Sequence, residues 1–194
     1  MIKFLKRIVC SVWYFCWGQL FILLFYKKKY IKGQYFKTRY GFSLGAMGWK
    51  WVYFDCINRI MSGNNVDVPF PCSPQIRIFN PENIEFDSDN LNNFQTFGNY
   101  YQAAAKISIG KGTYIAPNVG LITANHDFNN LKIWSEAKPI TIGENCWIGM
   151  NTVVLPGVIL GNHTIVGAGS VVTKSFSEGN CIIAGNPAKL IRKI

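Results

Sequence analysis

The sequence predicts an all-β fold in which short parallel strands wind into a three-sided β-helix. Aliphatic residues recur six positions apart without a break, at Ile142, Ile148, Val154, Leu160, Val166 and Val172. An α-helix repeats every 3.6 residues and a half-buried strand every two, so a strict period of six indicates an internal structural repeat. We expect each unit to form one short strand and one turn, so that three units close a coil of eighteen residues.

The second observation is a small or β-branched residue four positions after each aliphatic residue. These positions hold Cys146, Thr152, Val158, Thr164 and Ser170. In a narrow coil, residues of this size fit beside a corner while the larger aliphatic side chain fills the centre. We therefore predict that both series point into the β-helix.

The third observation concerns the corners, three positions after each aliphatic residue. These positions hold Asn145, Asn151, Gly157, His163 and Gly169. Gly, Asn and His are among the residue types that most readily adopt positive φ. The pairs Pro117-Asn118 and Pro156-Gly157 also match a type II turn. We predict left-handed backbone at these corners and interpret His163 as a corner residue.

Upstream, the same period continues less regularly and is interrupted by a loop. It runs through Leu91, Phe97, Ala103, Ile109, Ile115 and Leu121 and, after one extra residue, back to Ile84 and Ile78. Between Leu121 and Ile142 the spacing is twenty-one, so we expect the chain to leave the coil over about residues 124–139. A long loop in a regular solenoid indicates a functional segment.

These patterns divide the chain into residues 1–70 and a β-helical domain of residues 71–194. Residues 30–70 are aromatic without a period, and we expect helices or irregular structure there. The period also stops after Val172, so residues 189–194 are expected to form a short tail or a capping helix.

Residues 8–26 form a mostly apolar run, expected to be helical, with basic clusters on both sides. Its length and its Trp and Tyr residues fit a segment that lies on or dips into a membrane surface. The alternative is packing on the domain or on a neighbouring subunit. No small-x-small cleavage site follows the run, which argues against a cleaved signal peptide.

The net charge of +10 suggests nucleic acids or anionic membranes as possible partners. Much of the excess lies in the first forty residues, whereas residues 140–172 contain no Lys or Arg. This distribution argues against nucleic acid and favours a basic N-terminal face. The six cysteines lack a Cys-x-x-Cys pair, which favours a reducing compartment over a zinc ribbon or a disulfide framework.

The chain resembles the hexapeptide-repeat acyltransferases over about residues 78–194, more than half of its length. It is most similar to the sugar and polysaccharide O-acetyltransferases related to maltose, galactoside and xenobiotic acetyltransferases. The segments that carry the resemblance are IAPNV at 115–119, NHD at 125–127, NCWIG at 145–149, GAGSVVTK at 167–174 and AGNPA at 184–188. Each motif is modest alone, but their order and spacing make the resemblance specific.

This resemblance implies a left-handed parallel β-helix, which departs from the usual right-handed crossover, and a homotrimer with active sites between subunits. It implies acetyl-coenzyme A as donor and His126 as the general base that removes the acceptor's proton. An imidazole suits this role because it exchanges a proton near neutral pH. Asp127 is expected to orient the ring, a task that a backbone carbonyl could equally perform.

The resemblance also implies the residues that contact the donor. Trp147 matches an aromatic near the pantetheine arm, with outer-face packing as the alternative. Small residues would let the arm approach bare backbone. Thr173, Lys174 and Arg192 match positions near the adenosine and phosphate end. The complete expected donor set is Trp147, Gly149, Ala168, Gly169, Thr173, Lys174 and Arg192.

The acceptor side is expected to include Asn125, Tyr100, Tyr101 and Gln102. The chain lacks the N-terminal sequence of a maltose or galactoside enzyme and has a basic, apolar segment instead. This favours acetylation of a lipid-linked or nascent polysaccharide in capsule, exopolysaccharide or lipopolysaccharide synthesis. The expected location is the cytoplasm, at the inner face of the plasma membrane, with residues 1–29 at its surface.

Three other functions stay open. An N-acyltransferase acting on a nucleotide-linked amino sugar would usually carry an N-terminal βαβ region, but residues 1–70 contain no glycine-rich loop after a strand. An antibiotic acetyltransferase would share the catalytic histidine, and a non-catalytic β-helix scaffold would bind no coenzyme A. A zinc site like that of the gamma-class carbonic anhydrases needs three histidines, and the chain has two, so no metal is expected.

Overall fold

The computed structural model describes residues 2–37 and 46–194, so Met1 and residues 38–45 of the N-terminal segment lie outside it. The chain forms two compact units, Met1–Pro74 and Gln75–Ile194, and each is described by itself.

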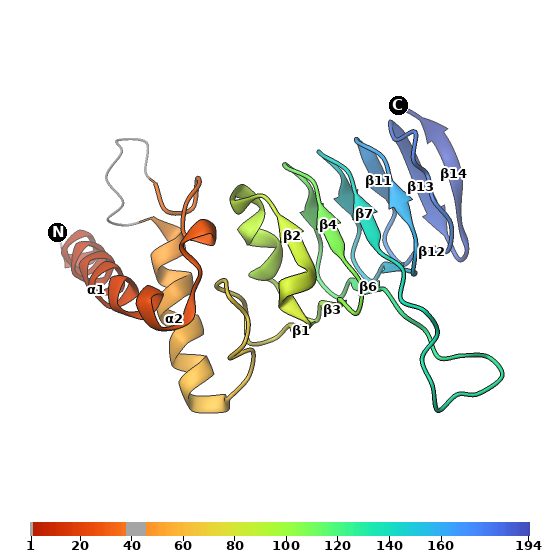
Figure 1. Cartoon of the computed structure of the whole chain (residues 1–194). Helices are drawn as coiled ribbons and strands as arrows, with labels where there is room; N and C mark the ends of the chain where they lie inside the picture. The colour runs from red at the N-terminus through yellow and green to blue at the C-terminus, as the bar shows by residue number, and fades with distance from the viewer. Residues whose placement is uncertain (1, 38–45) are drawn as a thin grey trace. The chain divides into compact units, whose positions relative to one another are not determined.

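The second unit is built almost wholly from short strands (Figure 1). In chain order they are β1 (Arg77–Phe79), β2 (Ile84–Phe86), β3 (Tyr100–Gln102), β4 (Ile107–Ile109), β5 (Tyr114–Ile115), β6 (Gly120–Ile122), β7 (Ile140–Ile142), β8 (Trp147–Ile148), β9 (Val153–Val154), β10 (Ile159–Leu160), β11 (Thr164–Val166), β12 (Val171–Val172), β13 (Cys181–Gly185) and β14 (Ala188–Lys193).

These strands stack into three sheets, which form the three sides of a β-helix. The first side has the order β1-β3-β6-β9-β12, the second β10-β7-β4-β2, and the third β14-β13-β11-β8-β5. From β4 to β12, consecutive strands occupy the three sides in rotation, and neighbours within each side are parallel. Thr141 pairs with Ile159 and Trp147 with Ile165, which confirms a coil of eighteen residues.

The regular coils have the interior and the corners that the period predicts. All six aliphatic residues from Ile142 to Val172 are buried. The small or β-branched residues from Cys146 to Ser170, each four positions after an aliphatic residue, are buried as well. The five expected corner residues have positive φ, from 53° at Asn145 to 82° at Gly157. His163, with φ of 54°, is confirmed as a corner residue.

The first coils follow a different pattern, and the expectation that Phe97 points inward is wrong. Phe97 is 47% exposed, whereas Tyr101 is fully buried on β3. The Tyr101 ring packs on Phe94, with 5.3 Å between ring centroids. Leu91 is buried as expected, but it lies in a 3-10 helix, Ser88–Phe94. Large aromatic side chains thus fill the first coils in place of the aliphatic residues, and the strict spacing is lost.

Buried asparagines complete the hydrogen bonding of these irregular coils. The Asn93 carboxamide donates to the Thr113 carbonyl at 2.9 Å and accepts from the Ile115 amide at 3.0 Å. Asn99 likewise accepts from the Val119 amide at 2.9 Å. Because a buried amide without a partner is costly, these side chains replace the strand that a regular coil would supply.

The chain ends in a β-hairpin, which corrects the expected C-terminal tail or helix. β14 pairs antiparallel with β13 and covers the last edge of the third side. An unpaired edge strand exposes a row of amides and carbonyls, and β14 satisfies those of β13. The all-β description is also inexact, because the first unit contains two α-helices.

The first unit consists mainly of α1 (Ile2–Phe25) and α2 (Met47–Ser62), which pack on each other. The Phe15 and Trp49 ring centroids lie 5.0 Å apart, and those of Tyr14 and Tyr53 5.2 Å apart. The stretch Ile8–Phe25 of α1 is long and apolar enough to cross a membrane by length and composition.

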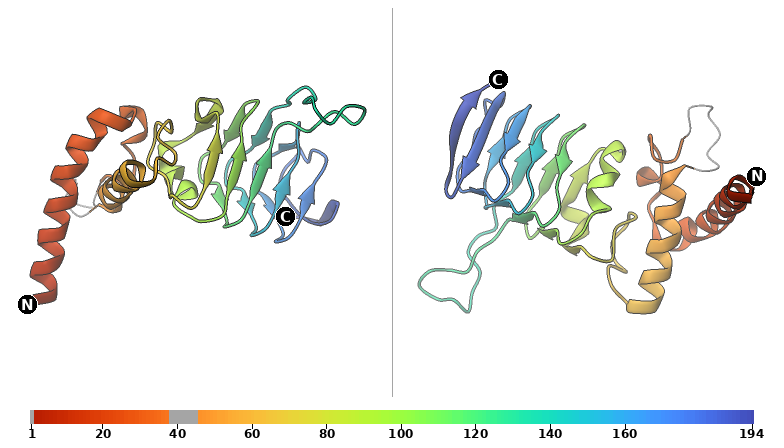
Figure 2. Two further views of the ribbon diagram at one scale, coloured as in Figure 1. Left: turned by 90° about the horizontal axis from the view of Figure 1, so that it is seen from below. Right: turned by 180° about the vertical axis from the view of Figure 1, so that it is seen from behind.

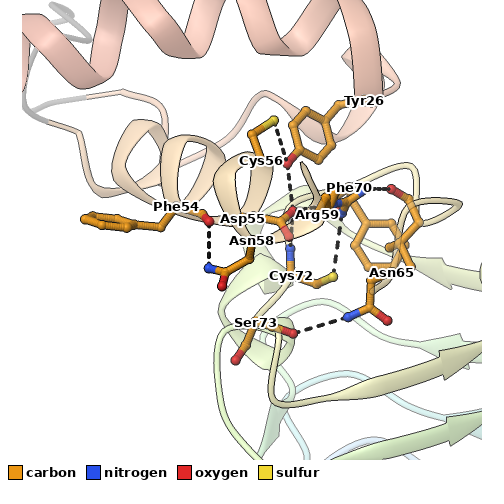
Figure 3. A network of polar contacts seen from close by, with 11 residues as sticks. Tyr26, Phe54, Asp55, Cys56, Asn58, Arg59, Asn65, Phe70, Cys72 and Ser73 are labelled. Atoms are coloured by element: carbon orange, nitrogen blue, oxygen red, sulfur yellow. Dashed lines mark hydrogen bonds and ion pairs between the residues drawn. The ribbon is translucent and has the colours of Figure 1, made fainter. Parts of the chain in front are cut away.

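A buried polar network lies at the junction of the two helices (Figure 3). Asp55 Oδ2 accepts from the Tyr26 hydroxyl at 2.7 Å and from Arg59 Nε at 3.0 Å. Arg59 also donates to the Val68 and Phe70 carbonyls, at 2.5 and 2.8 Å. Burial raises the pKa of the Asp55 carboxyl, an effect that the bonds from Arg59 oppose. The network fixes α2 to the end of α1 and to the segment that follows α2.

Candidate active site

The loop 123–139 leaves the β-helix between β6 and β7 and projects away from it (Figures 1 and 2). Its two ends are joined where Lys138 N donates to the Thr123 carbonyl at 2.8 Å. Ala124 N donates to the Gln102 carboxamide oxygen at 2.9 Å, and Ala105 N donates to the Thr123 hydroxyl at 3.1 Å. The base of the loop is therefore fixed on β3 just before the chain reaches His126.

His126 is exposed on this loop and paired with Trp134. The two residues form an antiparallel bridge, flanked by backbone hydrogen bonds of 3.0 and 2.8 Å. Their ring centroids are 5.3 Å apart, with 44° between the ring planes. The indole thus supports one side of the imidazole, and the remainder of the ring is accessible from solution.

Asp127 shapes the turn of the loop. Its carboxylate oxygen Oδ1 accepts from the Asn129 amide at 2.8 Å and from the Asn130 amide at 2.9 Å. These bonds hold the chain in a tight turn, as Asp side chains commonly do. A role for Asp127 in orienting the His126 ring stays a prediction.

The expected acceptor residues separate into exposed and buried pairs. Asn125 and Tyr100 have exposed side chains, so both can face a ligand. The Asn125 carbonyl accepts from the amide and from the hydroxyl of Ser135, which again fixes the loop next to His126.

Two expected acceptor contacts, Tyr101 and Gln102, are wrong. Tyr101 is fully buried, and its hydroxyl donates to the Asn93 carbonyl at 3.1 Å, inside the β-helix. Gln102 is buried as well, and its carboxamide binds the Ala124 amide. Side chains alternate along a strand, so Tyr100 points outward and Tyr101 inward. The sequence alone did not show which of these residues would face the interior.

Trp147 and Arg192 lie in one row on the outside of the third side. Strand pairing aligns, in order, Tyr114, Trp147, Ile165, Ile182 and Arg192. Trp147 is 56% exposed and Tyr114 61% exposed, so the row presents two neighbouring aromatic side chains to solvent. Sequence reasoning missed Tyr114, although it precedes Ile115 as Trp147 precedes Ile148, and this shared repeat position was the available signal.

The backbone amides of Gly149 and Gly169 both donate hydrogen bonds within the β-helix and are not free to bind a ligand. Gly149 N donates to the Val166 carbonyl at 2.9 Å, and Gly169 N donates to the Met150 carbonyl at 2.8 Å. A Cβ on Gly149 would lie 2.6 Å from Ala168 N, so glycine is required there by the stacking of adjacent coils. Ala168 and Gly169 themselves are exposed at a corner.

Thr173 and Lys174 lie at the last coil, away from the Trp147 row. Lys174 lines a cavity of about 300 Å³ together with Phe176, Leu190 and Lys193. Lys193 pairs with the buried Cys181, whereas Arg192 pairs with Ile182, whose side chain lies on the outer face. Lys174 and Arg192 therefore lie on opposite faces of the β13-β14 hairpin, and the structure does not bring the expected phosphate-binding residues together.

Trp134 is the second residue that the sequence did not single out, since only the hairpin pairing within the loop reveals its contact with His126. Within residues 2–37 and 46–194, no group of three or more His, Cys, Asp or Glu could hold a metal ion.

Comparison with known proteins identifies the repeat. Residues 139–174 match the family described as bacterial transferase hexapeptide (six repeats). The chain is 46% identical over 93 residues to a putative acetyltransferase of Saccharomyces cerevisiae. The matched segment covers 46% of this chain and 47% of that protein. It is 38% identical over 124 residues to a putative lipopolysaccharide biosynthesis O-acetyl transferase of Escherichia coli, covering 57% and 61%.

Among solved structures, a galactoside acetyltransferase in complex with coenzyme A superposes with a TM-score of 0.55 at 33% identity, covering 63% of this chain and 60% of that one. The chain spans about half the length of the first curated relatives that it matches. These likenesses cover part of the chain rather than its entire length.

Proposed function

We propose that this chain, whose β-helix carries the hexapeptide repeats of bacterial transferases, is an acetyl-coenzyme A-dependent O-acetyltransferase that acts on a sugar hydroxyl. The observation that carries the proposal is the placement of His126. It is exposed on a loop fixed at its base, and its ring is supported on one side by Trp134. The repeat likeness further supports a left-handed β-helix and a homotrimer with sites shared between subunits.

In this mechanism His126 acts as a general base. A neutral imidazole nitrogen accepts the proton of the acceptor hydroxyl while that oxygen attacks the thioester carbonyl of acetyl-coenzyme A. The C–S bond then breaks, the acetyl group stays on the sugar oxygen, and the proton held by His126 passes to the departing sulfur. The adjacent indole of Trp134 limits the positions available to the ring, which favours a productive geometry.

The donor is proposed to contact the outer row of the third side. Trp147 and Tyr114 offer an apolar surface for the pantetheine arm, and Arg192 at the end of the row offers a charge for phosphate. Thr173, Lys174 and the cavity that Lys174 lines lie on a different face. They would contact the donor only if it extended around the last coil.

The acceptor is proposed to be a lipid-linked or nascent polysaccharide at the inner face of the plasma membrane. The likeness to a protein named for lipopolysaccharide biosynthesis supports this substrate class. The second support is α1, which exposes apolar side chains between basic clusters and so fits a membrane surface.

The test is acetyl transfer by the full chain, measured as thiol release from acetyl-coenzyme A with a panel of glycans. His126→Asn should lower kcat by at least about a hundredfold, as expected for loss of a general base. His163→Asn is the matched control, because Asn occupies the equivalent corners at positive φ, and its activity should equal that of the wild type. Comparable rates in the two variants would contradict the proposal.

A further inference from the structure

The exposed face of α1 is mostly apolar from Leu5 to Leu24, although Lys6 and Gln19 are exposed as well. The exposed positions follow helical spacing and form one stripe, consisting of Leu5, Ile8, Val9, Val12, Trp13, Trp17, Leu20, Leu23 and Leu24. Residues 8–25 contain no Asp, Glu, Lys or Arg. A helix that packed on a protein and faced water with its other side would carry polar residues there. This lipid-facing stripe, as we call it, therefore needs an apolar neighbour.

The opposite face of α1 is already occupied by α2. Tyr14 packs on Tyr53 and Phe54, and Phe21 packs on Tyr53. At Gly18 the helices approach so closely that a Cβ would lie 2.8 Å from a Trp49 ring carbon. Figure 2 shows α2 end-on in its left view, on one side of α1. The contacts span the middle and the end of the stretch that could otherwise cross a membrane.

The residues of α2 are incompatible with the hydrocarbon core of a bilayer. Lys50 is exposed, and Asp55 and Arg59 form a buried ion pair of 2.7 Å. If α1 crossed the membrane, α2 would enter the hydrocarbon with it, and ionised side chains are costly at that depth. The contact between the helices thus argues for α1 lying along the membrane surface.

Basic residues stand at both ends of the stripe. Lys6 lies next to Leu5 at its N-terminal end, and Lys27, Lys28 and Lys29 follow it, all with exposed side chains. Lys27 N also donates to the Pro69 carbonyl at 2.9 Å, which holds the second cluster near the segment that follows α2. Cations flanking an apolar stripe match a bilayer that contains anionic phospholipids.

We propose that α1 and α2 form a monotopic membrane-binding unit, in which the lipid-facing stripe of α1 enters a single leaflet of an anionic bilayer and α2 forms a second layer on the aqueous side. Both ends of α1 then lie on the same side of the membrane. This inference rests on the proposed membrane location and adds the mode of attachment.

The topology is tested with Lys6→Cys and Lys28→Cys, each made in a full-length parent in which Cys10 and Cys16 are serine. Inside-out membrane vesicles from cells that express each variant are treated with a membrane-impermeant maleimide before and after permeabilisation. Both sites should react fully before permeabilisation. Reaction of only one of them before permeabilisation would show a spanning helix and overturn the inference.

The binding face is tested by flotation with vesicles of phosphatidylethanolamine and phosphatidylglycerol. Trp17→Glu, on the stripe, should lower the bound fraction at least about tenfold, because a charge replaces an apolar side chain in the interface. Met61→Glu adds the same charge on α2, where Met61 is 82% exposed, and should bind like the wild type. Equal losses in both variants would overturn the assignment of the two layers.

Thiol release from acetyl-coenzyme A with a soluble glycan, measured in detergent, should be the same for all these variants. If the wild-type protein does not float with the vesicles, both the membrane-binding unit and the proposed membrane location are overturned. The proposed acetyl transfer is then still tested separately by the His126 variants.

Discussion

The carboxamide oxygen of Gln102 accepts a hydrogen bond from the backbone amide of Ala124 at 2.9 Å, two residues before His126. Gln102 lies on β3 and is buried, so a side chain of the β-helix sets the point where the loop that carries His126 departs. The same residue accepts from the Thr123 amide through its own carbonyl, at 3.3 Å. Gln102 thus holds the start of the loop through both its side chain and its backbone carbonyl.

Gln102→Leu should therefore lower kcat about tenfold and leave the KM for acetyl-coenzyme A unchanged, since it displaces the base without touching the donor. Gln102→Glu keeps an acceptor oxygen for Ala124 and should recover much of the lost rate. Steady-state kinetics on both variants provides the test. A change in the KM for the acceptor alone would instead support direct binding by Gln102.

Trp134→Ala removes the ring that packs on His126 and should lower kcat by about threefold to tenfold through looser placement of the imidazole. Its thermal stability should match the wild type, because Trp134 is 52% exposed and lies in the loop. Phe128→Ala, also in the loop but away from the bridge to His126, is the control. A melting curve and a kinetic assay of each variant separate the two effects, and an unchanged rate in Trp134→Ala would contradict a role of Trp134 in placing the imidazole.

Gly149→Ala should destabilise the β-helix by about 1–3 kcal/mol, because the added Cβ would press on the backbone of the next coil. Gly169→Asn is the matched corner variant. No atom lies within 4 Å of a Cβ built at Gly169, and Asn tolerates its φ of 71°, so stability should change little. Denaturant unfolding of both variants measures the difference, and similar losses would contradict this account of coil stacking.

Arg59→Met should destabilise the first unit by about 3–5 kcal/mol, because it leaves the Asp55 carboxylate buried without its cation. Lys106→Met breaks a salt bridge to Glu85 in which both side chains are well exposed, and should cost less than about 1 kcal/mol. The free energy of unfolding from denaturant titration checks the pair. If the two variants lose the same amount, the buried network does not hold the helices together.

The period of six was enough to predict the coil, because each repeated residue type meets a local physical requirement that does not depend on distant contacts. A corner with positive φ selects Asn, Gly or His, and a narrow interior selects an aliphatic and a small residue, so the positions from Ile142 to Val172 could be read directly. The excursion of the loop that carries His126 followed from the broken spacing.

Tertiary structure decided what the spacing could not express. Tyr101 is inside and Tyr100 is outside because pairing with β1 and β6 fixes the register of β3, and Gln102 is buried where it binds the base of the loop. The contact between His126 and Trp134 and the row that joins Tyr114 to Trp147 both arise from chain pairing. The sequence by itself determined the repeat and the residue types at its corners and in its interior, whereas the neighbours of each side chain depended on how strands distant in the chain were aligned.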